Sequence, residues 1–177
     1  MYNEYELRVT NIDKEKFIKS IEEKGAEFVN NYEQKRYVYD FNPIDENRWI
    51  RLRTDGIKTT LAIKEYKNDS IGGTEEIEIE VSDMEKTNVI LEKLGYIKRS
   101  VQENKRTRYM LDDVEIDIDT WPHLNTYVEF ESNNEENIKS LLNKLSIDIK
   151  DTTTMNAQGM YYSLGYTQED LNDLRFE

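Results

Sequence analysis

Eight segments of the chain alternate polar or charged side chains with apolar ones, and this pattern constrains the fold more than any other feature. Successive side chains of a β-strand point to opposite faces, so a period of two predicts strands. The predicted strands cover residues 3–9, 34–41, 48–54, 59–66, 75–81, 104–111, 113–119 and 127–131. Eight antiparallel strands are enough to close a barrel around a usable interior.

Three other segments have the period of an amphipathic helix, in which one face is apolar. These predicted helices cover residues 13–24, 83–94 and 135–145. Ser82 and Ser132 each stand three residues before a glutamate, which is typical of a capping box at a helix start. We expect a short fourth helix over residues 167–174. The order of elements predicts an antiparallel α+β fold, formed by one domain over residues 1–177.

Composition excludes several classes of function. The formal net charge is −13, which argues against nonspecific binding to nucleic acid or to an anionic membrane. The chain has no cysteine and one histidine, His123, so thiolate metal sites, cysteine nucleophiles and histidine clusters are excluded. The first residues lack the pattern of a signal peptide, and we expect a cytoplasmic protein. Gly72 and Gly73 lack the surroundings of a phosphate-binding P-loop and predict a turn.

Charges in the predicted strands are sorted by sign. Like charges two residues apart on one strand lie about 7 Å from each other, which costs on the order of 2 kcal/mol per pair at an effective dielectric of 20. The same-sign sets are Glu4 and Glu6; Arg51 and Arg53; Glu76, Glu78 and Glu80; Arg106 and Arg108; Glu115, Asp117 and Asp119; Glu129 and Glu131.

Two interpretations account for these rows. A solvated outer face explains any single strand, but a face built for solubility mixes its charges. The alternative is that the charged faces converge on a shared interior, while the apolar faces turn outward beneath the helices. Acidic rows would then bind divalent cations, and basic rows would bind a highly charged anion. A metal-bound polyphosphate satisfies both.

The charged motifs, taken in order, resemble those of the CYTH superfamily, the triphosphate tunnel metalloenzymes, which include class IV adenylate cyclases and thiamine triphosphatases. The motifs are Glu4-x-Glu6-x-Arg8, Arg51-Leu-Arg53, Ala62-Ile-Lys64, Glu78-Ile-Glu80, Arg106-Thr-Arg108, Asp119 in DIDTWP, and Glu129-Phe-Glu131. This resemblance implies an eight-stranded antiparallel β-barrel that forms a tunnel for a triphosphate, with Mg²⁺ or Mn²⁺ as cofactor.

The resemblance also implies roles for individual residues. Substrate-binding roles fall to Arg8, Arg51, Arg53, Lys64, Arg106 and Arg108. Metal-binding roles fall to Glu4, Glu6, Asp119, Glu129 and Glu131. Catalytic roles fall to Glu78, Glu80 and Arg8. The sequence departs from the family pattern at Arg8, where a lysine is usual, and in the loop from Asp119 to Glu129, which lacks the usual glycines.

These features favour a metal-dependent enzyme that hydrolyses an organic or inorganic triphosphate such as ATP, thiamine triphosphate or tripolyphosphate. One alternative is an adenylate cyclase that converts ATP to cyclic AMP and pyrophosphate. A second is a noncatalytic nucleotide or polyphosphate sensor, although carboxylates beside phosphate would not help a pure anion binder. A third is an interaction protein with a charged surface. The partner is expected to be a small molecule, and the protein a monomer or homodimer.

Overall fold

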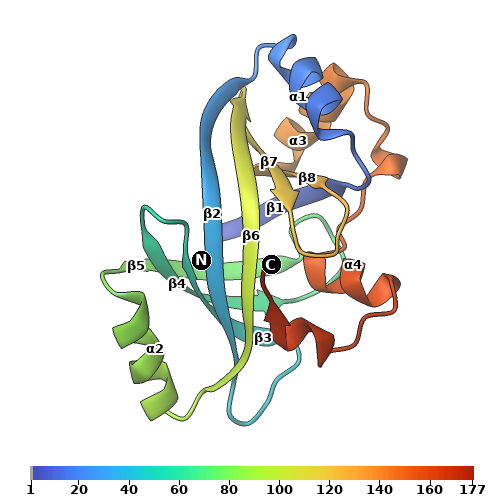
Figure 1. Cartoon of the computed structure of the whole chain (residues 1–177). Helices are drawn as coiled ribbons and strands as arrows, with labels where there is room; N and C mark the ends of the chain where they lie inside the picture. Colours follow the sequence, from blue (N-terminus) through green and yellow to red (C-terminus); the bar gives the residue numbers. More distant parts are fainter. Residues whose placement is uncertain (1) are drawn as a thin grey trace.

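A long antiparallel sheet curls round a central space and has helices against its outer side (Figure 1). The computed structural model describes the backbone of residues 2–177 and the side chains from Tyr5 onward. The strands of the barrel are β1 (Tyr2–Val9), β2 (Glu27–Asp40), β3 (Arg48–Thr54), β4 (Thr59–Tyr66), β5 (Thr74–Val81), β6 (Ile97–Leu111), β7 (Val114–Thr120) and β8 (Tyr127–Ser132). The α-helices are α1 (Lys14–Glu22), α2 (Met84–Lys93), α3 (Glu135–Leu145) and α4 (Ala157–Ser163).

The eight strands close into a ring of antiparallel pairs. Their order in the sheet is β2-β3-β4-β5-β1-β8-β7-β6, and β6 pairs again with β2. That closing ladder is the longest, from Glu27 opposite Met110 to Asp40 opposite Ile97. Closure leaves no exposed edge along these two strands. The α+β fold with an eight-stranded antiparallel barrel is confirmed.

The apolar faces of the strands turn outward, as a charged interior requires. Helices α1 and α3 lie side by side over β1, β7 and β8 and bury one core between them and the sheet (Figure 1). Ile21, Ile116, Phe130 and Ile138 are fully buried there. Burying side chains of this size stabilises the fold by about 1.5–3 kcal/mol each.

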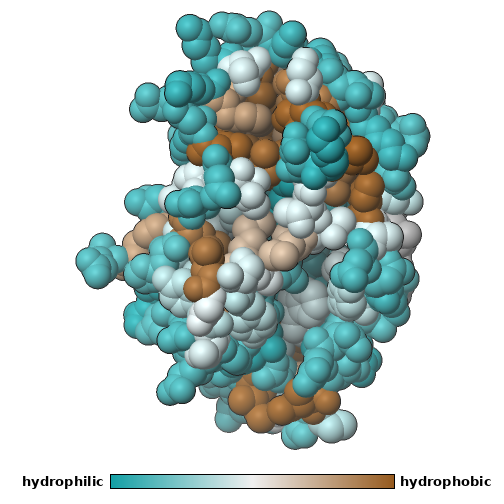
Figure 2. Space-filling view, turned by 90° about the vertical axis from the view of Figure 1, so that its right-hand side faces the viewer, coloured by the Kyte–Doolittle hydropathy of each residue, from teal (hydrophilic) through white to brown (hydrophobic). Residues whose placement is uncertain are grey.

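Helix α2 covers a second core on the outer side of β2 and β3, where Tyr39 and Leu52 are fully buried. The three helices that the sequence predicts do not cover the whole barrel, because Ile63, Ile77 and Ile79 on the outer side of β4 and β5 are 41–57% exposed. On the side shown in Figure 2, hydrophilic residues cover most of the surface, and hydrophobic residues gather in patches between them.

The C-terminal segment closes one side of the barrel. Helix α4 is followed by a loop, by the 3-10 helix η2 (Asp170–Asn172), and then by β9 (Asp173–Leu174), which pairs in parallel with β6. Tyr161 and Leu171 pack with Trp121 in a third core. The phenol of Tyr161 donates a hydrogen bond to the carbonyl of Pro122 at 2.5 Å. This segment therefore lines the interior as well as the surface.

The structure corrects several local predictions. The fourth helix expected over 167–174 is wrong: Asp170 accepts hydrogen bonds from the backbone and hydroxyl of Thr167, and a 3-10 turn and a short strand follow. Its apolar spacing reflects burial of Leu171 and Leu174 against the barrel. Helices α2 and α3 are capped by Asp83 and Asn134 rather than by the serines. Within residues 2–177, no helix has the length and apolar character that a membrane span requires.

Candidate functional site

The barrel encloses a cavity of about 660 Å³ that is lined mainly by charged side chains. Its described lining is divided by charge. Strands β2 to β5 contribute four cations and two carboxylates, namely Arg36, Arg51, Arg53 and Lys64 with Glu76 and Glu78. Strands β1, β7 and β8 contribute one cation and five carboxylates, namely Arg8 with Glu6, Glu115, Asp119, Glu129 and Glu131. Arg99, Arg106 and Arg108 come from β6, between the two walls.

On the basic wall, carboxylates of β5 hold three of the predicted phosphate ligands. Arg51 lies 2.6 Å from Glu76 and 2.8 Å from Glu78. Lys64 lies 2.8 Å from Glu76, whereas Arg53 is 3.5 Å from Glu78. Burial and the neighbouring Arg51 and Arg106 lower the pKa of Arg53 to about 10. At Arg53, burial and the neighbouring arginines therefore outweigh the stabilisation that Glu78 and Glu76 provide.

Arg36 belongs to the same wall and is absent from the sequence-based assignment. It lies directly opposite Arg53 in the β2–β3 register. Its guanidinium donates to the amide oxygens of Gln34 and Asn104 and lies over the ring of Trp121. Burial, followed by repulsion from Arg53, Arg51 and Arg106, lowers the pKa of Arg36 to about 9. Arg36 has no residue of like charge two positions away on β2, so the pattern of same-sign pairs in the sequence could not identify it.

On the acidic wall, Arg8 is enclosed by its own partners. Its guanidinium lies 2.7 Å from Glu6 and 2.5 Å from Glu129, and it donates to the carbonyls of Thr154 at 3.2 Å and Met155 at 3.4 Å. The side chain is 6% exposed. Although burial favours the neutral form, Glu129 and Glu6 keep the pKa of Arg8 well above its ordinary value. Arg8 is consequently a fixed cation at neutral pH.

Arg106 connects the acidic strands into one buried network. It donates two hydrogen bonds to Asp119, at 2.8 Å and 2.6 Å, and lies 2.5 Å from Asp117 and 3.3 Å from Glu129. Arg108 pairs in turn with Asp117 and with Glu115, which lies 2.5 Å away. Of the predicted metal ligands, Glu6, Asp119 and Glu129 are therefore each paired with an arginine.

Glu129 shows how strongly these cations act. Burial alone would raise the pKa of Glu129, but Arg8 and Arg106 lower it to about 2. Tyr127, two residues earlier on the same face, is 2% exposed, and burial together with Asp119 and Glu129 raises its pKa well above the ordinary range. The carboxylate is thus ionised and the phenol neutral at physiological pH.

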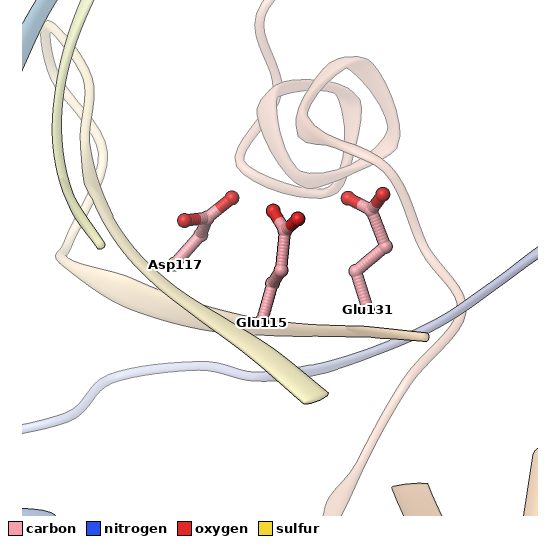
Figure 3. Close-up of side chains that lie close together, drawn as sticks. All are labelled: Glu115, Asp117 and Glu131. Atoms are coloured by element: carbon pink, nitrogen blue, oxygen red, sulfur yellow. The ribbon is translucent and has the colours of Figure 1, made fainter. Parts of the chain in front are cut away.

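Three carboxylates lie close enough together to hold a divalent cation, and two of them, Glu115 and Asp117, also pair with Arg108. Glu115, Asp117 and Glu131 each bring an oxygen to within 4.8 Å of the others, and their side chains project to the same side of β7 and β8 (Figure 3). Glu6 stands opposite Glu131 in the β1–β8 register. Clustered carboxylate oxygens suit Mg²⁺ or Mn²⁺. The acidic row in β7 is visible in the sequence, but the family resemblance does not imply a metal-binding role for Glu115 and Asp117.

Two predicted site residues are not brought into this arrangement. The side chain of Glu80 is 74% exposed and lies 4.0 Å from Lys58, outside the described cavity lining. The side chain of Glu4 lies outside the described residues. The other predicted residues all line this cavity: Glu6, Arg8, Arg51, Arg53, Lys64, Glu78, Arg106, Arg108, Asp119, Glu129 and Glu131.

The family model described as the CYTH domain matches residues 3–154. The fold is similar to that of the PH1012 protein from Pyrococcus horikoshii OT3, with 20% identity and a TM-score of 0.76, over 86% of this chain and 96% of that one. No curated protein matches the chain.

Two further solved structures share the fold. A protein of Vibrio parahaemolyticus, proposed to be an adenylate cyclase, has 14% identity and a TM-score of 0.74, over 91% of this chain and 98% of that one. HpAC1 from Hippeastrum, proposed to be an adenylyl cyclase and found to have a dominant triphosphatase activity, has 15% identity and a TM-score of 0.61, over 93% of this chain and 96% of that one.

Proposed function

The chain belongs to the CYTH domain family, and we propose that it is a metal-dependent enzyme that hydrolyses a triphosphate bound in the barrel cavity. One observation carries this proposal. Arginines from β2, β3 and β6 crowd into a single cavity of about 660 Å³, where burial and mutual repulsion lower the pKa of both Arg36 and Arg53. A polyanion is the ligand that relieves this repulsion.

The basic wall is suited to hold the phosphoryl groups. Arg36, Arg51, Arg53 and Lys64 face one space from three adjacent strands, so a chain of phosphoryl groups could contact several of them at once. Guanidinium groups match phosphate oxygens with two parallel donors, which fixes orientation as well as charge. In phosphoryl transfer, positioning and charge neutralisation provide most of the catalysis.

The acidic wall is suited to hold the cation. Glu115, Asp117 and Glu131, with Glu6 opposite Glu131, would bind Mg²⁺ or Mn²⁺. A bound divalent ion neutralises developing charge on the phosphate and lowers the pKa of coordinated water. Arg106 and Arg108 fix the carboxylates of Asp117 and Asp119 and so hold the acidic wall in place.

Hydrolysis is the favoured reaction because it needs no pocket for a nucleoside. The structurally similar Hippeastrum protein, in which triphosphatase activity is dominant, gives independent support. Residues 155–177 lie beyond the family match but pack against Trp121 and pair with β6. We therefore include them in a single functional domain over residues 1–177.

The decisive experiment identifies products. The protein would be incubated with tripolyphosphate, thiamine triphosphate or ATP, each with Mg²⁺, Mn²⁺ or EDTA. Release of orthophosphate that stops with EDTA and is lost in Arg53→Ala, but retained in the outward-facing control Lys105→Ala, is expected. Formation of cyclic AMP and pyrophosphate from ATP would instead identify a cyclase. If no substrate turns over with either metal, the protein is not this enzyme.

A further inference from the structure

Several buried N–H groups of the cavity lining have no acceptor among the side chains and backbone that the structure describes, and two of them lie together on one side of the cavity. These two are the Nε of Arg36 and the Nε1 of Trp121. The guanidinium carbon of Arg36 lies 4.5 Å from the centre of the Trp121 ring, so the two donors are neighbours. Both residues line the cavity. Buried donors are almost always hydrogen-bonded in folded proteins, so an unsatisfied pair at a cavity wall indicates a ligand.

Arg36 also differs from the other cavity arginines in its neighbours. Arg8, Arg106 and Arg108 each contact two or more carboxylates. Within residues 5–177, no carboxylate lies within ion-pair distance of Arg36, whose partners Gln34 and Asn104 are neutral. Amide oxygens fix the direction of a guanidinium but do not neutralise its charge. The missing partner is therefore an anion rather than a neutral acceptor.

The position of Arg36 along the wall decides which part of a ligand it would contact. Along β2, Arg36 is opposite Arg53 and Val38 is opposite Arg51. Asp40 is opposite Trp49, which is in turn opposite Lys64. Each of these steps is two residues, or about 7 Å along the strands. Arg36 thus stands at one end of a row of cations, and Lys64 stands at the other.

We propose that Arg36 and Trp121 form a subsite for one terminal phosphoryl group of the bound polyphosphate, and that this subsite selects three phosphoryl groups over two. The inference depends on the proposed function, because it assumes that the cavity takes a polyphosphate. A tripolyphosphate has one phosphoryl group more than a diphosphate, so it can place one group at this subsite while the other two contact neighbouring cations of the row. A diphosphate that contacts the middle of the row has no third phosphoryl group to place at the subsite. Selection then follows from the additional charge-assisted hydrogen bonds.

The experiment is a comparison of two ligands by isothermal titration calorimetry, with tripolyphosphate and diphosphate, each with and without Mg²⁺. The central variant is Arg36→Met, which keeps a side chain of similar length over the indole and removes the charge and donors. Its matched control is Lys35→Met, which removes one positive charge from the next residue, on the opposite face of β2. Trp121→Phe removes the indole donor and keeps an aromatic ring.

In the wild type, we expect tripolyphosphate to bind more tightly than diphosphate. Arg36→Met should weaken tripolyphosphate binding roughly 10- to 100-fold and diphosphate binding less than threefold. Trp121→Phe should act in the same direction with a smaller effect, and Lys35→Met should change neither. If Arg36→Met does not fold, Arg36→Lys replaces it, and an about tenfold loss confined to tripolyphosphate is expected.

The outcomes separate this inference from the proposed function. If the wild type binds tripolyphosphate and Arg36→Met weakens both ligands equally, or neither, the subsite is wrong while the triphosphate function stands. Equal losses in Arg36→Met and Lys35→Met would also overturn the subsite, since they would reveal a general effect of charge. If the wild type binds neither ligand, the proposed function itself fails.

Discussion

The guanidinium of Arg8 and the carboxylate of Glu129 face each other across two neighbouring strands at 2.5 Å, and both are buried. Arg106 approaches the same carboxylate from β6 at 3.3 Å. Glu129 is therefore held between two cations from opposite sides, although the family resemblance implies a metal ligand at this position. A structural contribution of this carboxylate can be tested apart from its role in metal binding.

The first prediction concerns Glu129→Gln. The amide keeps the shape of the side chain but leaves Arg8 and Arg106 short of one buried negative charge. Breaking a buried ion pair from one side typically costs about 3–5 kcal/mol, and we expect the free energy of unfolding at pH 7 to fall toward the lower end of that range because the amide oxygen still accepts a hydrogen bond. Urea denaturation measures it, with the exposed Glu33→Gln as control. A change as small as that of the control would mean that the pair does not stabilise the fold.

The pH dependence of that difference has a definite sign. Arg8 and Arg106 lower the pKa of Glu129 in the folded state to about 2, from an ordinary value of 4.5. A lowered carboxyl pKa stabilises the fold above the unfolded pKa, and the stabilisation is lost as pH falls from about 4.5 toward 2. The stability gap between wild type and Glu129→Gln should narrow in that window. A gap that stays constant from pH 7 to pH 2.5 would contradict the pKa assignment.

The barrel and most of its interior could be predicted because the strands that alternate polar and apolar residues also carry charges of one sign on their polar face. Arg51 with Arg53, and Glu129 with Glu131, each indicate that one face of a strand is used for charge. Arg36 could not be found this way because its neighbours on that face are Gln34 and Val38. Glu80 is a residue that the pattern assigns wrongly to the site. It lies on the same face of β5 as Glu76 and Glu78, but β5 extends beyond the cavity at that point and the side chain is exposed to solvent.

The second prediction concerns Arg36 in the absence of ligand. An arginine whose pKa is lowered by burial and by other cations destabilises the folded state while it stays protonated. The free energy of unfolding of Arg36→Met at pH 7 should therefore be about 1 kcal/mol higher than that of the wild type. The free energy of unfolding of Lys35→Met should stay within about 0.5 kcal/mol of the wild-type value. Chemical denaturation in metal-free buffer measures both.

The sign of the pH effect provides a check on this second prediction. The folded-state pKa of Arg36, about 9, lies below its ordinary value of 12.5, so its penalty is fully present below pH 9 and declines as pH rises above it. The advantage of Arg36→Met should shrink between pH 8 and about pH 10. A variant less stable than wild type across this range would show that the contacts to Gln34 and Asn104 outweigh the charge repulsion.

The third prediction addresses the metal. Glu131→Gln removes one charged oxygen ligand from the group of Glu115, Asp117 and Glu131, so the Mg²⁺ or Mn²⁺ concentration for half-maximal activity should rise by about tenfold or more. Metal-free binding of tripolyphosphate should be unchanged or slightly tighter, because a repulsive carboxylate is gone. Activity titrations with each metal and calorimetry in EDTA measure the two quantities. An unchanged metal requirement would remove Glu131 from the metal site.

The fourth prediction concerns the affinity of the cavity for tripolyphosphate. Among the described side chains, the carboxylate nearest to Arg53 is that of Glu78, at 3.5 Å, so the charge of Arg53 is available to a ligand. Arg53→Ala should lose one charge-assisted hydrogen bond, about 1.5–3 kcal/mol, and the thermal shift caused by tripolyphosphate should shrink accordingly. Binding should also depend less steeply on salt than in wild type. The outward Lys105→Ala keeps the full shift if the effect is local to the cavity.

The last prediction asks what an arginine does at position 8. Arg8 reaches the carbonyls of Thr154 and Met155 as well as Glu6 and Glu129, and its backbone pairs with Thr153. Arg8 thus ties the segment before α4 to the barrel, while its charge is already matched by two carboxylates. A lysine would keep one ion pair, but it lacks the planar set of donors that serves carboxylates and carbonyls together.

Arg8→Lys should therefore lower the free energy of unfolding by about 1–3 kcal/mol and speed hydrogen exchange in residues 153–163, while exchange in α1 stays as in wild type. Affinity for tripolyphosphate should fall less than threefold. Hydrogen exchange with mass spectrometry and calorimetry on the same preparation measure both. The opposite result would be unchanged hydrogen exchange with a loss of tripolyphosphate affinity of tenfold or more. It would make Arg8 a direct phosphate ligand, as the family resemblance implies, and would show that Glu6 and Glu129 release Arg8 when substrate binds.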